Sequence, residues 1–142
     1  ASPAYLDAHG TPQTPQDLLD HAALLYSLRK TPDFAYTGPD SQHGTISLKG
    51  KHSANNAKIL CDLAVAGHGF IIMPVFHLCQ AFSEGLLVPI LTDYDWGDVN
   101  AYAVYPSRRH LSHRVRTFID FLDAYYKGYR PWETCFDQYV TS

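Results

Sequence analysis

The segment Ala64-Val-Ala-Gly-His-Gly-Phe-Ile-Ile-Met-Pro74 contains, in order, a helix end, a turn, a short apolar strand and a proline. Before it, Leu60 and Cys61 lie at helical spacing, and the two glycines predict that this helix ends near residue 67. Residues 70–73 are apolar throughout, which is typical of a strand covered on both faces. A further helix is predicted over residues 75–83. Helix, strand and helix in this order form a crossover unit, which indicates an α/β fold.

Helices and strands also alternate on both sides of this unit. On the amino-terminal side we predict helices over residues 2–10 and 14–21, a strand over 23–26, and a pair of strands over 33–37 and 45–49. On the other side we predict extended segments over residues 86–91 and 101–105 and a long helix that begins at Ser112. The apolar stripe of that helix consists of Val115, Phe118, Ile119 and Leu122.

The composition describes one domain, or part of one. The chain has 142 residues, of which 46% are hydrophobic and 18% are charged, so intrinsic disorder is excluded as its default state. Its net charge of −3 argues against direct nucleic-acid binding, which calls for a basic surface. No apolar run is long enough for a membrane span and no signal segment opens the chain, so we expect no membrane partner. The first residue is Ala1 rather than Met, which suggests a processed product or an excised piece.

The three cysteines, Cys61, Cys79 and Cys135, are an odd number at wide spacing. Cys61 and Cys79 have apolar neighbours, as small buried hydrophobic residues do. We therefore expect no disulfide framework, and a reducing, cytoplasmic compartment.

Catalytic and metal sites find little support in the sequence. His110 and His113 are a close histidine pair, but four arginines surround them, which opposes a cation site. The helical spacing of Cys61 predicts a neutral, inert thiol. No Gly-x-Ser-x-Gly turn and no phosphate-binding glycine loop is present. We expect no enzyme, no metal and no cofactor.

The start of the central helix is more informative. Ser53, Asn55 and Asn56 bring a hydroxyl, two amides and free backbone N–H groups to a helix start. Such an end suits a carboxylate, although plain helix capping explains the same residues equally well. Pro74 follows the carboxyl end of the buried strand, where α/β sheets place their ligands.

The chain resembles the carboxyl-terminal part of the effector-binding domain of LysR-type transcriptional regulators. The resemblance begins at Ala1-Ser-Pro-Ala-Tyr-Leu-Asp-Ala-His-Gly-Thr-Pro12 and includes residues 15–18, 55–57, 64–74, 85–88, 103–112 and 115–122. It implies a type 2 periplasmic-binding-protein-like fold, in which two α/β subdomains enclose a cleft for a small effector. Residues 1–100 would then be the second subdomain, residues 101–127 the strand and helix that return to the first, and residues 128–142 an appended aromatic tail.

The resemblance also implies a function. The cleft residues carried over by position are Ser2, Ser53, Asn55, Met73, Pro74 and Val75. Hydroxyl, amide and apolar groups together suit a small organic acid. DNA would be read by a winged helix-turn-helix domain that is absent from this chain, and the exposed stripe of the last helix favours homo-oligomers. The alternatives are a small stand-alone α/β enzyme and the solute-binding protein of a transporter.

Overall fold

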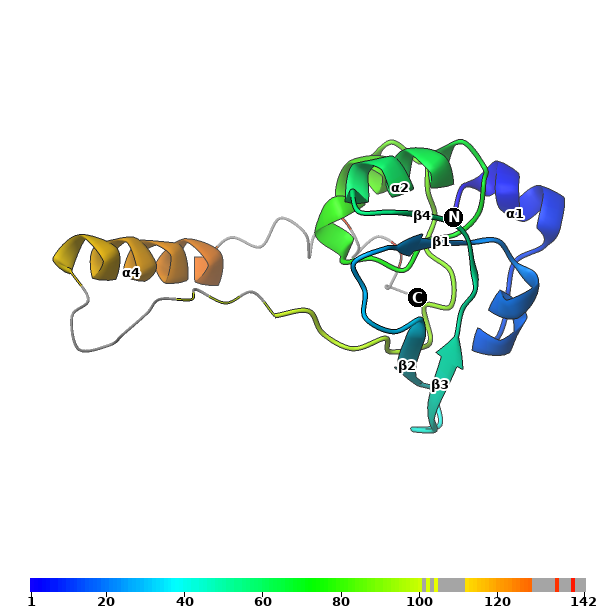
Figure 1. The fold of residues 1–142 in the computed structure, drawn as a ribbon, viewed down its shortest axis with the longest axis horizontal. Coiled ribbons are helices and arrows are strands. Elements are labelled where there is room, and N and C mark those ends of the chain that lie inside the picture. The colour runs from blue at the N-terminus through cyan, green and yellow to red at the C-terminus, as the bar shows by residue number, and fades with distance from the viewer. Residues whose placement is uncertain (101, 103, 105–111, 129–134, 136–138, 140–142) are drawn as a thin grey trace.

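The computed structural model describes residues 1–100, 102, 104, 112–128, 135 and 139. Figure 1 shows a body that contains both sheets and the helices up to residue 83, while α4 (His113–Gly128) stands apart from it. In the part of the chain that the structure describes, no helix is long and apolar enough to cross a membrane.

Three parallel chain segments form the centre of the body. β1 (Ala23–Tyr26) pairs in parallel with β4 (Gly50–Ala54), with Leu25 opposite Ser53. On the other side of β1, the Leu24 N–H donates to the Phe70 carbonyl at 2.9 Å, and the Phe70 N–H donates to the Ala22 carbonyl at 2.9 Å. We refer to residues 70–73 as the Phe70 segment. The order is therefore β4, β1, Phe70 segment, and the carboxyl ends of all three meet at one edge.

α2 (Ala57–Val65), which the sequence predicts as a helix, is the crossover connection between β4 and the Phe70 segment. The sequence did not predict β4 itself. Leu60 and Ala64, one turn apart, are fully buried against the sheet side of the helix. The helix ends before Gly67, whose φ of +79° is a backbone conformation that favours glycine. The α/β crossover expected from residues 55–83 is present.

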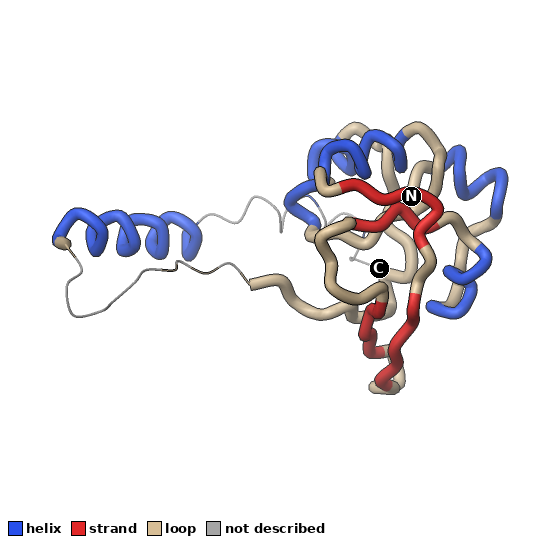
Figure 2. Tube along the Cα trace, viewed as in Figure 1, coloured by secondary structure: helices blue, strands red, loops and turns tan. Residues whose placement is uncertain are grey.

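A second sheet is the antiparallel hairpin of β2 (Asp33–Thr37) and β3 (His43–Ser47), which Figure 2 shows at the end of the body away from α2. Phe34 and Ile46 face each other across the hairpin, and both are buried. The predicted strand pair is thus confirmed, with the second strand shifted two residues toward the turn.

Two short helices cover the amino-terminal side. α1 (Pro3–His9) begins at Ser2, whose Oγ accepts the Tyr5 N–H at 3.3 Å, and ends at Gly10, as predicted. The next helix, η1 (Pro15–Asp20), is a 3-10 helix. The Asp17 carboxylate accepts the backbone N–H groups of Gln13 and Thr14, both at 2.9 Å, and these hydrogen bonds lower the pKa of Asp17.

The core has two parts, one on each side of the central segments. The first lies between α1, η1 and the hairpin, and it contains Tyr5, Leu6, Leu18, Phe34, Ile46, Leu48 and Phe70. The second lies beneath α2, and it contains Leu24, Leu60, Ala64, Leu78, Ala81, Phe82 and Leu87. β1 contributes to both, because Ala23 faces the first part and Leu24 the second.

Several predicted elements differ from the structure. The strand over residues 70–73 is reduced to the pairing of Phe70 with Ala23. The single helix over residues 75–83 is two pieces, the 3-10 turn η2 (Val75–His77) and α3 (Cys79–Ser83). Residues 86–91 form no regular strand, although the Val88 N–H donates to the Ala1 carbonyl at 2.8 Å. The predicted strand over residues 101–105 lies outside the described residues except for Tyr102 and Val104.

The expectation of a chain without disulfides is wrong. Cys79 on α3 and Cys135 in the tail form a disulfide, with their Cα atoms 5.3 Å apart and a sequence separation of 56. The wide spacing hid this pair, because sequence separation does not report which cysteines meet in space. Cys61 is a free thiol.

Candidate functional site

The carboxyl edge of the parallel segments holds most of the residues expected to bind a ligand. β4 ends at Ala54 and continues into Asn55, and β1 ends at Tyr26. The Ser27 N–H donates to the Ala54 carbonyl at 2.9 Å, which ties the two strand ends together. Met73, Pro74 and Val75 follow the Phe70 segment toward the same edge. We refer to residues 26–27, 53–56 and 73–75 as the carboxyl edge.

Asn56, and not Ser53, caps α2. The Asn56 Oδ1 accepts the Lys58 N–H at 2.8 Å and the Ile59 N–H at 3.3 Å. Ser53 lies three residues earlier, inside β4, where its side chain is exposed. The sequence interpretation of Ser53 as part of the helix start is therefore wrong, since the strand extends through it. Ser53 still lies at the edge because β4 ends one residue later.

The apolar side of the edge is formed by half-buried residues. Met73 and Val75 pack against the second core, and Pro74 begins the 3-10 turn η2. The His77 N–H donates to the Pro74 carbonyl at 3.1 Å, so this carbonyl is used within the turn. The side chains of residues 73–75 can offer a ligand an apolar surface. The Ser53 hydroxyl and the Asn55 amide lie on the other side of β1, two strand spacings or about 10 Å away.

Ser2 lies at the opposite end of α2. It is buried with 3% of its surface exposed, and its Oγ serves as the cap of α1. A Cβ placed on Gly67, just beyond the carboxyl end of α2, would lie 3.8 Å from this oxygen. Asn55 precedes the amino end of the same helix, so about nine residues of helix, roughly 14 Å, separate the two positions. The structure places Ser53, Asn55, Met73, Pro74 and Val75 along one edge of the parallel segments, but not Ser2.

The electrostatics of the edge suit a weakly held anion. The first turn of α2 points its N–H groups outward, but Asn56 already accepts two of them. Lys58 follows at once, and its Nζ forms an exposed pair with Asp62 at 2.9 Å that raises the pKa of Lys58. A carboxylate would therefore meet a capped helix start and one exposed ammonium group.

Two edge residues were missed by the sequence interpretation. Tyr26 and Ser27 end β1, the central segment, and so lie between Asn55 and Met73 along the edge. The available signal was the predicted strand over residues 23–26, because the residue after a parallel strand belongs to this edge. Tyr26 is 40% exposed, so its ring is available to a ligand.

A separate concavity of about 480 Å³ lies on the hairpin. Its walls include Tyr36 and Trp96, with ring centroids 5.5 Å apart, and Thr37, whose Oγ1 lies 3.0 Å from the His43 Nδ1. None of these lining side chains is fully buried, and the polar groups around it are exposed. Ser53 and Asn55 at the carboxyl edge are exposed as well, so exposure does not separate the two places. The carboxyl edge remains the candidate because α/β sheets place their ligands at the carboxyl ends of parallel strands.

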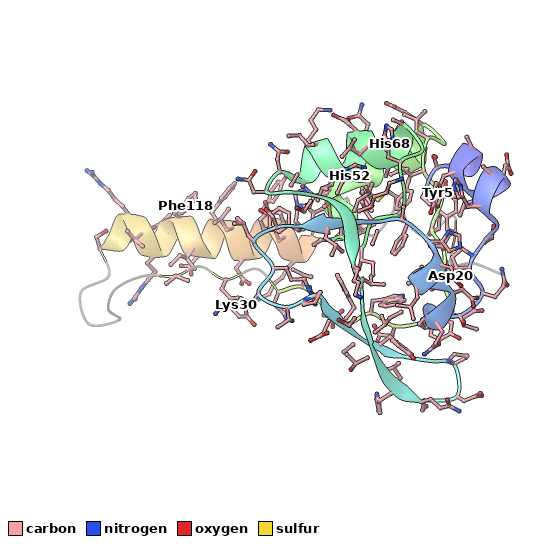
Figure 3. The ribbon with its side chains drawn as sticks, turned by 45° about the vertical axis from the view of Figure 1, so that its right-hand side comes forward. Tyr5, Asp20, Lys30, His52, His68 and Phe118 are labelled. Atoms are coloured by element: carbon pink, nitrogen blue, oxygen red, sulfur yellow. A yellow bond between two sulfur atoms is a disulfide. The ribbon has the colours of Figure 1, made fainter. Side chains whose placement is uncertain are left out.

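Among the residues that the structure describes, other reactive groups give no competing site. Burial raises the pKa of the Cys61 thiol, which agrees with the expectation of an inert cysteine. Within the described ranges, no group of three or more His, Cys, Asp or Glu side chains is placed to hold a metal ion. His110 lies outside the described residues, and His113 begins α4. Figure 3 shows His52 and His68 close together on the body, with ring centroids 6.3 Å apart.

Comparisons with known proteins agree with this architecture. The family described as "LysR substrate binding domain" matches residues 1–127. An uncharacterized HTH-type transcriptional regulator of Haemophilus influenzae is 36% identical over 115 residues, which cover 81% of this chain and 40% of that protein. The HTH-type transcriptional regulator CrgA of Neisseria meningitidis is 30% identical over 123 residues, 86% of this chain and 41% of that protein.

Solved structures give the same answer. The full-length virulence activator AphB of Vibrio cholerae, a member of the LTTR family, matches with a TM-score of 0.76 and 28% identity over 88% of this chain and 43% of that one. The regulatory domain of CrgA matches with a TM-score of 0.68 and 29% identity over 88% of this chain and 62% of that one. The chain spans about two fifths of the curated relatives that it matches. These relatives are named transcriptional regulators. Their names confirm the interpretation of this chain as a regulatory domain, rather than the alternative of a small α/β enzyme.

Proposed function

Because the chain belongs to the LysR substrate-binding domain family, we propose that it is the effector-sensing and oligomerising part of a LysR-type transcriptional regulator. In this proposal residues 1–100 are the second effector subdomain, residues 101–127 return to the first, and residues 128–142 are an appended tail. DNA is bound by a winged helix-turn-helix domain outside these 142 residues. The protein works in the cytoplasm.

The proposed ligand is a small organic acid bound at the carboxyl edge. Ser53 and Asn55 contribute a hydroxyl and an amide for its carboxylate, and Met73, Pro74 and Val75 contribute an apolar surface. Ser2 remains in the proposed set only through the resemblance, as the residue that fixes the start of α1. The edge has one wall in this chain, so the first subdomain must supply the other.

The mechanism follows from differential affinity. An effector that binds the closed arrangement of two subdomains more tightly than the open one shifts the population toward closure. In an oligomer this changes the spacing of the DNA-binding domains, and the coupling is limited by the difference in the two affinities.

The observation that carries the proposal is the convergence of the family match over residues 1–127 with a sheet edge where polar and apolar groups meet. The test is a titration of the whole regulator with benzoate, with uncharged benzamide as the matched ligand. Ser53→Ala should weaken benzoate binding several-fold more than Ser47→Ala, because both serines are exposed strand residues but Ser47 lies on the hairpin. Equal affinities for benzoate and benzamide, or equal effects of the two substitutions, would reject the carboxylate site.

A further inference from the structure

The tail of this chain is covalently attached to α3. Cys79 is the first residue of α3, and its disulfide to Cys135 closes a loop across 56 residues. The family match ends at residue 127, so Cys135 lies beyond the shared domain. The attachment is therefore an addition to the family fold of this chain.

Tyr139 reinforces this attachment four residues further along the chain. Its hydroxyl donates to the Phe82 carbonyl at 3.2 Å, and the two rings are 5.5 Å apart between centroids. The Tyr139 side chain also packs against the second core. Cys135 and Tyr139 thus contact α3 at two points, residues 79 and 82.

The disulfide secures the tail, whereas α3 is held by other residues. Leu78, Ala81 and Phe82 are 5–7% exposed and fix α3 in the second core, while Cys79 is only half-buried. Breaking the disulfide leaves those apolar contacts in place. What it removes is the covalent link that keeps Cys135 beside α3.

We propose that Cys79 and Cys135 are a reversible thiol–disulfide latch that attaches the tail to α3 under oxidising conditions and releases it under reducing ones. Both sulfur atoms belong to half-buried residues, so small oxidants and reductants can approach them. Docking of Tyr139 places Cys135 beside Cys79, which favours the intramolecular bond over a bond between chains.

An organic hydroperoxide is a two-electron oxidant that can close the latch. One thiolate attacks the terminal peroxide oxygen; an S–O bond forms, the O–O bond breaks, and the alkoxide leaves as the alcohol after taking a proton. The second thiolate attacks the resulting sulfenic sulfur and displaces hydroxide, which leaves as water. Two thiols and one hydroperoxide give one disulfide, one alcohol and one water. A dithiol reverses the step by thiol–disulfide exchange.

The latch connects to the carboxyl edge through the second core. Met73 and Val75 pack against the same core that Tyr139 packs against, and η2 leads from Val75 directly to α3. Release of the tail removes the Tyr139 ring from this shared core. This coupling rests on the proposed function of the edge, whereas the latch itself does not.

The test uses the full 142-residue chain and its single methionine, Met73, as a reporter. The chain is reduced with dithiothreitol or oxidised with tert-butyl hydroperoxide, and its free thiols are labelled with a maleimide and counted by mass spectrometry. The ε-methyl NMR signal of Met73 is recorded in both states. Cys61→Ser is the matched control, because it removes the third cysteine and leaves the pair intact.

We expect three labels on the reduced chain and one on the oxidised chain, and a Met73 methyl signal that moves on oxidation and returns on reduction. Cys61→Ser should keep the shift, while Cys79→Ser and Cys135→Ser should each abolish it. Oxidation that joins Cys61 to another cysteine, or that only links separate chains, would overturn the latch. A correct disulfide with an unmoved Met73 signal would overturn the coupling alone, whereas a whole regulator that fails to bind benzoate in either redox state would count against the proposed function alone.

Discussion

Gly69 lies against Ala22 so closely that a Cβ at position 69 would overlap the carbonyl oxygen of Ala22. The same carbonyl accepts the Phe70 N–H at 2.9 Å, so the contact lies where the Phe70 segment joins β1. The φ of Gly69 is +154°, at the edge of the region that side chains rarely adopt. The parallel arrangement thus depends on a residue without a side chain at this point.

Gly69→Ala should therefore destabilise the chain by about 2–4 kcal/mol, because the backbone of Ala22 or of the Phe70 segment must move. Gly85→Ala is the matched control. Gly85 also has a positive φ, +67°, but a Cβ there would meet nothing within 4 Å. It should cost only about 1 kcal/mol. Urea unfolding measures the free energy of unfolding of both variants. Equal losses of stability would show that overlap with the Ala22 carbonyl does not determine the cost of Gly69→Ala.

The buried amino group of Ala1 should make the stability of the 142-residue chain depend on pH. This group donates to the Val88 carbonyl at 3.0 Å, and burial lowers its pKa from 8.0 to about 6. The folded chain then binds fewer protons than the unfolded chain between these values. The free energy of unfolding should be highest above about pH 8 and fall by about 2–3 kcal/mol as the pH drops to 6.

Other groups titrate in the same range, so this prediction needs a control chain. A Gly-Ser extension before Ala1 replaces the amine with a peptide N–H, which can still donate to Val88 but does not titrate. Urea unfolding of the two chains at pH 6 and pH 8 should show the smaller difference for the extended chain. The same pH dependence in both chains would assign the effect to groups other than Ala1.

The apolar residues of α4 should drive self-association. Val115 is 42% exposed and Phe118 60% exposed, and Figure 3 places Phe118 well away from the body. Burial of each such side chain stabilises by roughly 1.5–3 kcal/mol as an upper estimate. Phe118→Glu should lower the mass found by sedimentation equilibrium toward 15.9 kDa, whereas Thr117→Glu, on the polar side of the helix, should not. An unmodified chain that sediments at 15.9 kDa at all concentrations would contradict the prediction.

The chain alone should not bind duplex DNA in a sequence-dependent manner. Its net charge is −3, and we place the recognition helix in a domain outside these residues. A gel-shift assay at physiological salt should show no specific complex, and addition of the winged-helix domain in the full protein should restore one. Submicromolar, sequence-specific binding of DNA by the 142 residues alone would contradict the assignment of DNA recognition to another domain.

The elements that the sequence predicted correctly are those whose own residues carry a signal. α2 has its apolar residues at helical spacing, and the hairpin strands pair Phe34 with Ile46. β4 carried no such signal, because residues 50–54 are Gly, Lys, His, Ser and Ala. Its backbone pairing with β1 makes it a strand, and that pairing is a tertiary contact that local sequence does not report.

The same distinction between local sequence signals and tertiary contacts applies to the candidate site. The carboxyl edge was predictable, since Pro74 ends an apolar segment and Asn55 precedes a helix. The exact cap was not, because Ser53, Asn55 and Asn56 are all good capping residues, and only the length of β4 selects Asn56. The disulfide was also unpredictable, because it depends on where the tail meets α3.

The most direct test of effector binding at the carboxyl edge is amide chemical-shift mapping of the whole regulator during a benzoate titration. We predict that the largest shifts occur at Ser27, Asn55 and Val75, and that benzamide produces much smaller ones. Shifts concentrated instead on the hairpin concavity at Tyr36 and Trp96, or equal shifts with both ligands, would contradict an acid-binding site at this edge.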